Sequence, residues 1–219
     1  MNQVNKRLLL IIFAALTALL GGCSASSKQT VPQDPDPDAI LKALFDVEQI
    51  KSAKSVITHP LSEISEIEDH ISIRYQYAFL VKGVVDEKNN AVPNKLYITS
   101  AVENTKKGRE ISIRYIDGGI NGEIRKQNPK HRTFTVNPCG QETGSDCEDG
   151  QMAPYEAEAV IFSVDDFPEL KPQQNVVDIS VKYALANSKK ELREQFLSDR
   201  GLQERDKAEV SLKLPESFY

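Results

Sequence analysis

A five-residue alternating pattern recurs in this chain of 219 residues and constrains its fold more than any other feature. "ISIRY" stands at 71–75 and again at 111–115, and "ISVKY" occupies 179–183. Alternate side chains of a strand point to opposite faces, so the apolar or aromatic first, third and fifth residues share one face. Serine and a basic residue occupy the other. The pattern predicts strands that are buried on one face.

The spacing of the copies favours three similar strands over a repeated functional module. They begin at 71, 111 and 179, so the separations are 40 and 68 residues, and the flanking sequences differ. A solenoid or propeller requires a steadier period. A duplicated binding module remains the alternative for the first two copies.

The charges in the first two copies predict how they pair if they are neighbours. Parallel pairing in register would place Arg74 beside Arg114, and like charges directly opposite each other destabilise a sheet. Antiparallel pairing would instead place Arg74 opposite Ser112. We therefore expect antiparallel pairing.

The rest of the chain predicts a mainly β (α+β) fold, an antiparallel β-sandwich-like domain with an N-terminal and a C-terminal flanking helix. Apolar residues repeat at helical spacing in 38–53, with Asp38 as a candidate N-cap, and Ser188 and Glu191 have capping-box spacing at the start of a helix that Gly201 can end. Asp117-Gly118-Gly119 is typical of a hairpin turn. Further strands are expected within 78–86, 95–102, 120–126, 132–136, 155–164 and 208–215.

The first residues are typical of an export signal. Lys6 and Arg7 precede an apolar run from Leu8 to Leu20, which is too short to span a bilayer as a helix but suits a signal peptide. Leu20-Gly21-Gly22-Cys23 then resembles the lipobox of bacterial lipoproteins. The alternative is an uncleaved membrane helix with an incidental cysteine.

The lipoprotein resemblance implies that residues 1–22 are removed and that Cys23 carries a diacylglyceryl thioether as lipid attachment site. Several acyl chains anchor a protein firmly to a membrane. Ser24 after the cysteine resembles the outer-membrane signal of Gram-negative lipoproteins. This implies an outer-membrane lipoprotein that faces the periplasm or the cell surface.

Composition divides the remaining chain into two parts. Residues 23–38 are rich in serine, proline and aspartate, which predicts a disordered tether that holds the domain off the membrane. Residues 39–219 are long enough for a single β-rich domain. A sub-boundary near 137–153 is the alternative.

Cys139 and Cys147 stand at the ends of a turn-rich segment. An exported protein meets an oxidising compartment, which favours a disulfide between them over free thiols. A zinc site would need further ligands, and no cysteine or histidine lies close by in the sequence. We expect the stapled loop to be a binding surface, since it loses less entropy on binding.

Residues 81–100 are similar to a segment of bacterial Ig-like and transthyretin-like β-sandwich domains. Gly83, Val85 and Asp86 match the end of one strand, Asn89-Asn90 match the turn, and Val92-Pro93-Asn94 match the restart. The resemblance implies binding, adhesion or assembly rather than catalysis.

Charge and motifs favour a non-catalytic role. Without residues 1–22 the chain has 25 basic residues (27 less Lys6 and Arg7) and 32 acidic ones, a net charge of −7, which argues against nucleic-acid binding. We expect no cofactor, no metal site and no catalytic residue. His59, His70 and His131 lack ligand spacing, and the acidic run from Glu142 to Asp149 lacks the EF-hand order, although it leaves calcium open.

The sequence thus predicts a membrane-anchored envelope lipoprotein that acts as a non-catalytic binding or assembly module, with an envelope protein as partner. An envelope enzyme with a carboxylate-based site is one alternative, and a raised carboxylate pKa in a cleft would favour it. A small-ligand-binding lipoprotein is the other, and a closed apolar cavity would favour it.

Overall fold

The computed structural model describes most of the chain between Cys23 and Phe218. The described ranges are 23–25, 28–45, 53–85, 88, 90–120, 123–125, 130–138, 153–163, 176–197, 207–215 and 218. The structural statements below concern these residues. Side chains of the first strand and of a few other positions lie outside this description.

Strands dominate the described residues, and two helices accompany them. The helices are α2 (Pro37–Leu44) and α4 (Lys189–Leu197). The strands are β1 (Cys23–Ala25), β2 (Ser55–Pro60), β3 (Ile64–Glu68), β4 (Ile71–Lys82), β5 (Lys95–Asn104), β6 (Glu110–Ile120), β7 (Glu123–Arg125), β8 (Lys130–Val136), β9 (Tyr155–Ser163), β10 (Val176–Ala186) and β11 (Lys207–Lys213). The prediction of a mainly β fold is confirmed.

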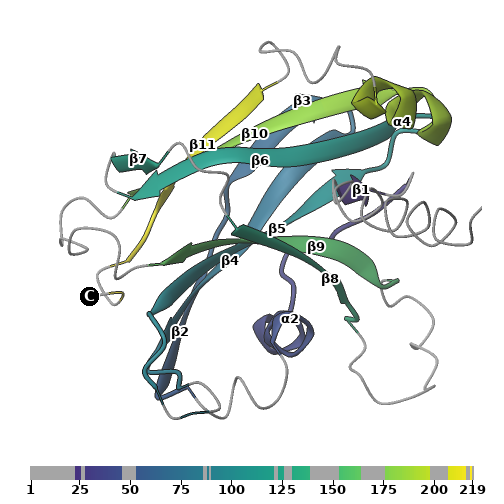
Figure 1. The fold of residues 1–219 in the computed structure, drawn as a ribbon. Coiled ribbons are helices and arrows are strands. Elements are labelled where there is room, and N and C mark those ends of the chain that lie inside the picture. Colours follow the sequence, from purple (N-terminus) through teal and green to yellow (C-terminus); the bar gives the residue numbers. More distant parts are fainter. Residues whose placement is uncertain are drawn as a thin grey trace, which may run out of the picture.

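The described strands form two antiparallel sheets (Figure 1). The five-stranded sheet has the order β1-β6-β10-β11, with β7 also paired to β6. The six-stranded sheet has the order β2-β4-β5-β9-β8, with β3 also paired to β4. One apolar cluster contains residues of both sheets, including Ile73 from β4 and Ile113 from β6, and therefore lies between them.

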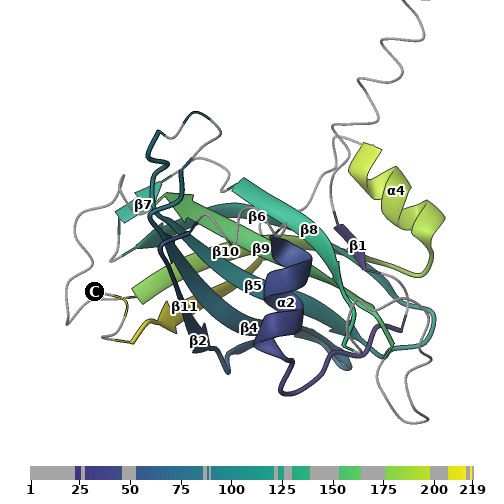
Figure 2. The ribbon, with the colours of Figure 1, turned by 90° about the horizontal axis from the view of Figure 1, so that it is seen from below.

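A second apolar cluster covers the other face of the six-stranded sheet. Helix α2 lies across this face (Figure 2). Its Ile40 and Leu44 are fully buried, and Phe79 and Phe134 belong to the same cluster. Asp36 is the N-cap of α2, since its carboxylate accepts a hydrogen bond from the Asp38 amide at 3.0 Å. The expected cap, Asp38, lies instead inside the first turn, because Pro37 with its fixed φ starts the helix.

Half of the capping box predicted for α4 is present, because Ser188 caps the Glu191 amide but Glu191 reaches back to the amide of Asn187 rather than to that of Ser188. The Ser188 hydroxyl accepts a hydrogen bond from the Glu191 amide at 3.2 Å, and the Glu191 carboxylate accepts one from the Asn187 amide at 2.9 Å. Leu192 of α4 packs on Ala184 and Ala186 of β10. Gly201, the expected end of the helix, lies outside the described residues.

The first two pentapeptide copies are not neighbours, so the expected pairing of Arg74 with Ser112 does not form. The copy at 71–75 belongs to β4 in one sheet and the copy at 111–115 belongs to β6 in the other. Both turn their apolar faces to the same cluster from opposite sides. The neighbour of the second copy is the third, and the register places Lys182 directly opposite Arg114.

The predicted hairpin turn at 117–119 is wrong, because these residues continue β6. A β-bulge lies just before them, between the pairs Val181–Tyr115 and Ser180–Asp117. A Cβ on Gly118 would lie 3.0 Å from the Phe162 ring of the opposite sheet and 3.1 Å from the Asp178 carbonyl oxygen. The lack of a side chain at Gly118 therefore allows the two sheets to approach each other closely here. Close approach is a common reason for glycine inside a strand.

The segment predicted as a tether packs on the domain over part of its length. Cys23–Ala25 form β1 against β6, and Val31 is buried in the cluster beneath α2. Gln29 is also buried, and its side chain bridges the ends of β5 and β9, where these strands no longer pair. The tether expected over 23–38 is therefore not free at 28–36, because Gln29 and Val31 are buried in the domain. The polar, proline-containing composition of this stretch did not indicate their burial.

Candidate functional site

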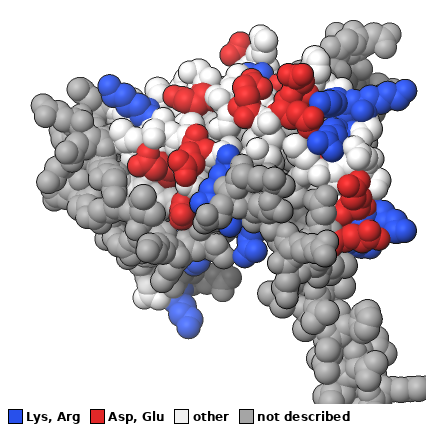
Figure 3. Space-filling model, turned by 90° about the horizontal axis from the view of Figure 1, so that it is seen from above, with Lys and Arg blue, Asp and Glu red and all other residues white. Residues whose placement is uncertain are grey.

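The outer face of the five-stranded sheet, which points away from the six-stranded sheet, carries charged side chains arranged in rows. Alternate residues of β6, β10 and β11 reach it, because those between them face the core. At one end of this face α4 covers Ala184 and Ala186. Beyond that end, charged side chains of both signs reach this face (Figure 3).

Three cations form a row across this face, which we call the cation row. Arg114 of β6 lies opposite Lys182 of β10, and Lys182 lies opposite Lys207 of β11. Arg114 and Lys207 are exposed and Lys182 is half-buried. Side chains at directly opposed positions have Cβ atoms about 5 Å apart. None of the three forms an ion pair with another described residue.

An acidic row follows beside the cation row. Asp117, Ser180 and Glu209 are the next residues on this face, opposite one another on the same three strands. Beyond them the Asp178 carboxylate accepts a hydrogen bond from the Ser211 hydroxyl at 2.6 Å. Successive rows on one face of a strand are about 7 Å apart. The face therefore presents a positive strip next to a negative one.

The cation row does not stabilise the fold. Like charges directly opposite each other on neighbouring strands are unfavourable, and this row has two such pairs in succession. A local rule that is broken without a compensating contact is expected mainly at functional or strained sites. The cation row is therefore the candidate functional site.

Replacing Lys182 with glutamate is expected to stabilise the isolated domain by about 1 kcal/mol, because a carboxylate would then stand between two cations. The midpoint of urea unfolding at low salt should rise, and the gain should shrink in high salt. Lys213→Glu is the matched control, since Lys213 lies on the same face opposite Val176. A fall in stability for K182E would contradict the cost assigned to the row.

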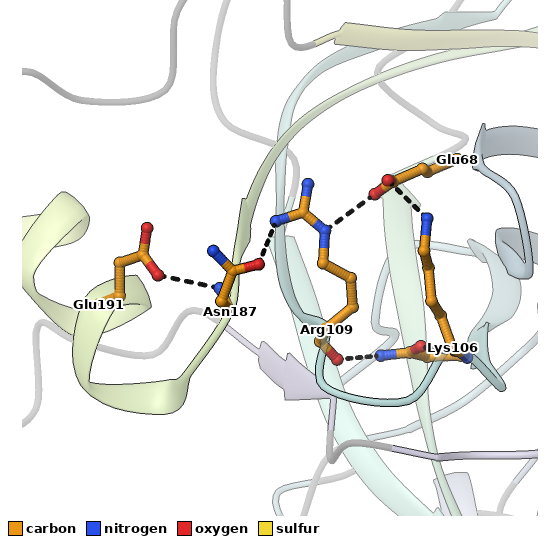
Figure 4. A network of polar contacts seen from close by, with 6 residues as sticks. Glu68, Lys106, Arg109, Asn187 and Glu191 are labelled. Carbon is orange, nitrogen blue, oxygen red and sulfur yellow. Dashed lines mark hydrogen bonds and ion pairs between the residues drawn. The ribbon is translucent and has the colours of Figure 1, made fainter.

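A polar network at one end of the sheets joins three separate elements (Figure 4). The Glu68 carboxylate contacts Lys106 Nζ at 2.7 Å and Arg109 Nε at 3.1 Å. Arg109 also donates to the Asn187 side chain at 3.2 Å, just before α4. The hydrogen bond from Lys106 and the pairing with Arg109 lower the pKa of Glu68. The network fixes the β5–β6 turn and is a structural feature.

Glu68→Gln should lower stability at pH 7 by about 1 kcal/mol, as expected for half-exposed ion pairs. A carboxyl group whose pKa is lowered by folding stabilises the fold above its unfolded pKa of about 4.3 and loses this contribution as the pH falls further. The difference between the wild type and E68Q should therefore vanish in acid. Glu194→Gln is the control, because Glu194 and Lys190 are largely exposed at 3.9 Å. An E68Q difference that persisted at low pH would contradict this assignment.

A cluster of buried polar side chains between the sheets comes closest to what the alternative prediction, an enzyme with a carboxylate-based site, requires. The hydroxyls of Ser100 and Tyr115 lie 2.5 Å apart, and Glu158 lies opposite Ser100 and is 5 % exposed. The cavity beside them has a volume of about 10 Å³, about the space of one water molecule. The cavity is too small for a ligand, so this group is not the candidate site.

Two other tyrosines are buried without chemical consequence. Burial raises the pKa of both Tyr75 and Tyr155 to about 12, so both hydroxyls stay protonated at neutral pH. Tyr155 accepts a hydrogen bond from Gln76 at 2.9 Å. This hydrogen bond joins the β4 bulge to the start of β9.

The structure separates the residues singled out from the sequence. Cys23 stands opposite Ile113, one residue from Arg114. Cys139 and Cys147, with the acidic run between 142 and 149, lie outside the described residues. His59 lies near Phe218, with ring centroids 6.3 Å apart, and His131 near Tyr115 at 6.5 Å, while His70 has a positive φ of 66° beside β4.

Sequence reasoning missed the cation row, although a signal was present. Arg114 and Lys182 occupy the same fourth position of two pentapeptide copies, and antiparallel pairing about that position brings them together. Within the described ranges, no group of three metal-binding side chains is found. Nor is any described helix long and apolar enough to cross a membrane.

Comparison with protein-family models gave no match, and neither did comparison with curated proteins or with solved structures.

Proposed function

We propose that this protein is a lipid-anchored module of the bacterial envelope that binds a protein partner, and that the cation row is the centre of its docking surface. In this proposal the two sheets are the layers of an antiparallel β-sandwich-like domain flanked by α2 and α4. Acyl chains on Cys23 hold it at a membrane, the outer membrane facing the periplasm or the cell surface. A Cys139–Cys147 disulfide and the Ig-like resemblance of 81–100 belong to the same proposal.

The observation that carries the proposal is the cation row itself. Arg114, Lys182 and Lys207 repel one another in the free protein, and a partner with carboxylates opposite them would relieve that repulsion. The three strands span about 10 Å at the usual strand spacing. The matching partner surface is therefore an acidic strip of that width.

The neighbouring acidic row would add specificity. A partner that places cations beside Asp117 and Glu209 would be aligned in one register, and a partner in the wrong register would meet like charges. Association through such strips should be fast at low salt and weaken steeply as salt is added.

A crosslinking experiment on cells tests the docking surface. A photo-crosslinking amino acid at Ser180, between Asp117 and Glu209 on the outer face, should yield a discrete protein adduct. The adduct should be lost in K182E, although that variant is expected to be the more stable protein. Lys213→Glu, with the same change of charge, should retain it. An adduct that is unchanged in K182E would contradict the proposal.

Cys23→Ser tests the anchor. We expect the variant to lose acylation, because serine offers no thiol for the diacylglyceryl thioether that anchors the protein. Metabolic labelling with a fatty acid, followed by isolation of the protein, measures this. A C23S protein labelled as strongly as the wild type would contradict the anchoring.

A further inference from the structure

Strand β2 is an edge strand that contains no lysine, arginine, aspartate or glutamate. Its sequence is SVITHP, from Ser55 to Pro60, and it stands at one end of the six-stranded sheet, paired with β4. Val56 and Ile57 are half-buried and Thr58 is exposed. Side chains branched at Cβ favour strands. An edge of this length and composition is a site at which a further strand can pair.

The other described edge strands longer than three residues all carry charged side chains, which are a usual protection against pairing at an edge. These charged residues are Glu66 and Glu68 on β3, Lys130 and Arg132 on β8, and Lys207, Glu209 and Lys213 on β11. β2 has six residues and none of this protection. The contrast indicates that its edge is a pairing site.

The outward backbone groups of β2 belong to alternate residues. The Leu61 amide donates to the Gln76 carbonyl at 2.8 Å, which continues the β2–β4 register by one residue. Hydrogen bonding alternates along an antiparallel pair, so Ile57 turns its amide to β4, whereas Val56 and Thr58 turn theirs to the open edge. Apart from the pairing with β4, neither outward amide has a hydrogen bond within the described residues.

We infer that two copies of this protein pair through β2, antiparallel and centred on Ile57. In this register Val56 lies opposite Thr58 of the other copy, so each outward amide meets an outward carbonyl. Ile57 lies opposite Ile57, and no like charges meet along the strand. Pro60, which has no amide hydrogen, occupies an outward position, where it removes no hydrogen bond with β4.

A second copy fits this edge because one register satisfies its backbone groups and matches an uncharged strand with another uncharged strand. The pairing is two-fold symmetric, so each copy uses its open edge and the assembly stops at a dimer. The inference goes beyond the proposed docking surface and depends on neither the cation row nor Cys23.

The dimer would leave the proposed docking surface uncovered. Figure 1 shows β2 at the bottom of the molecule and the five-stranded sheet at the top. A two-fold axis between two edge-paired strands runs perpendicular to the joined sheet, so both cation rows would lie on the same side of the dimer. A partner with two acidic strips could then bind both copies, which raises its overall affinity without new contacts.

A cysteine at the two-fold axis tests the register. In Ile57→Cys the two Cα atoms would be about 4.5 Å apart, as in a pair without hydrogen bonds between its two residues, which is within the range that a disulfide spans. Mild oxidation of the purified protein in detergent should convert most of I57C into a disulfide-linked dimer. The wild type and Thr58→Cys, whose two thiols would lie diagonally and too far apart, should stay free of such a dimer. An I57C protein that behaves like T58C would overturn the inference.

Two substitutions at Thr58 separate pairing from folding. Thr58→Pro removes an amide that points away from β4, whereas Thr58→Ala keeps that amide. Sedimentation equilibrium in density-matched detergent should give the wild type and T58A twice the protein mass of T58P, and T58P should keep the circular dichroism spectrum of the wild type. K182E should remain dimeric, so failure of the docking surface would leave this result unchanged. A monomeric wild type, or a T58P protein that associates as strongly as T58A, would overturn the pairing.

Discussion

Replacing Gln29 with glutamate is expected to lower the free energy of unfolding by about 3 kcal/mol at pH 7, since two buried carbonyls would lose their donor and face a carboxylate. The Gln29 amide donates to the Val102 and Glu156 carbonyls, and its oxygen accepts from the Glu156 amide at 3.1 Å. These bonds join β5 to β9 beyond the last described pair of the two strands. They also tie the N-terminal segment to the domain.

The pH dependence of the Q29E stability loss distinguishes the loss of these hydrogen bonds from a loss of packing alone. Burial and the two carbonyl oxygens should raise the pKa of the introduced carboxyl group above its unfolded value of about 4.3. The protonated acid can donate a hydrogen bond, so the loss in Q29E should shrink below that pH and grow as the pH rises through the folded pKa. Urea unfolding from pH 4 to 8 measures it. Thr30→Ala, at an exposed neighbour, is the control, and a Q29E loss that does not vary with pH would contradict the assignment.

Gly118→Val is expected to destabilise the domain by about 3 kcal/mol, as overpacking at a sheet interface does. Even a Cβ would lie 3.0 Å from two atoms of the Phe162 ring and 3.1 Å from the Asp178 carbonyl oxygen. The backbone oxygen cannot move without disturbing the pairing of β6 with β10. Thermal unfolding should show a large drop in the transition midpoint.

A second substitution tests the named cause. Phe162→Leu removes the outer ring atoms that the new side chain would meet, so Gly118→Val should cost clearly less in that background than in the wild type. Equal costs in both backgrounds would show that the ring does not set the requirement for glycine.

The strands were predictable because their signal is local. Ile71, Ile73 and Tyr75 alternate with polar residues, and the structure buries all three between the sheets. Ser188 and Glu191 likewise predicted the cap of α4 from their spacing alone. Features of this kind depend on neighbours along the chain, which a sequence displays directly.

Pairing and close approach were not predictable, because they depend on residues distant in sequence. Nothing near Gly118 shows that Phe162 of the other sheet will lie against it. Nothing in 28–36, a polar and proline-containing stretch, shows that Gln29 will fill a gap between β5 and β9. The candidate site was missed for the same reason, since Arg114 and Lys182 meet only through the register of β6 with β10.

The intact mass of the protein extracted from membranes decides whether it is lipid-anchored. We predict a chain that begins at Cys23 and carries a diacylglyceryl group on its sulfur, with a further acyl chain on its amine in most molecules. A chain that begins at Met1, or one that begins elsewhere with an unmodified Cys23, would contradict it.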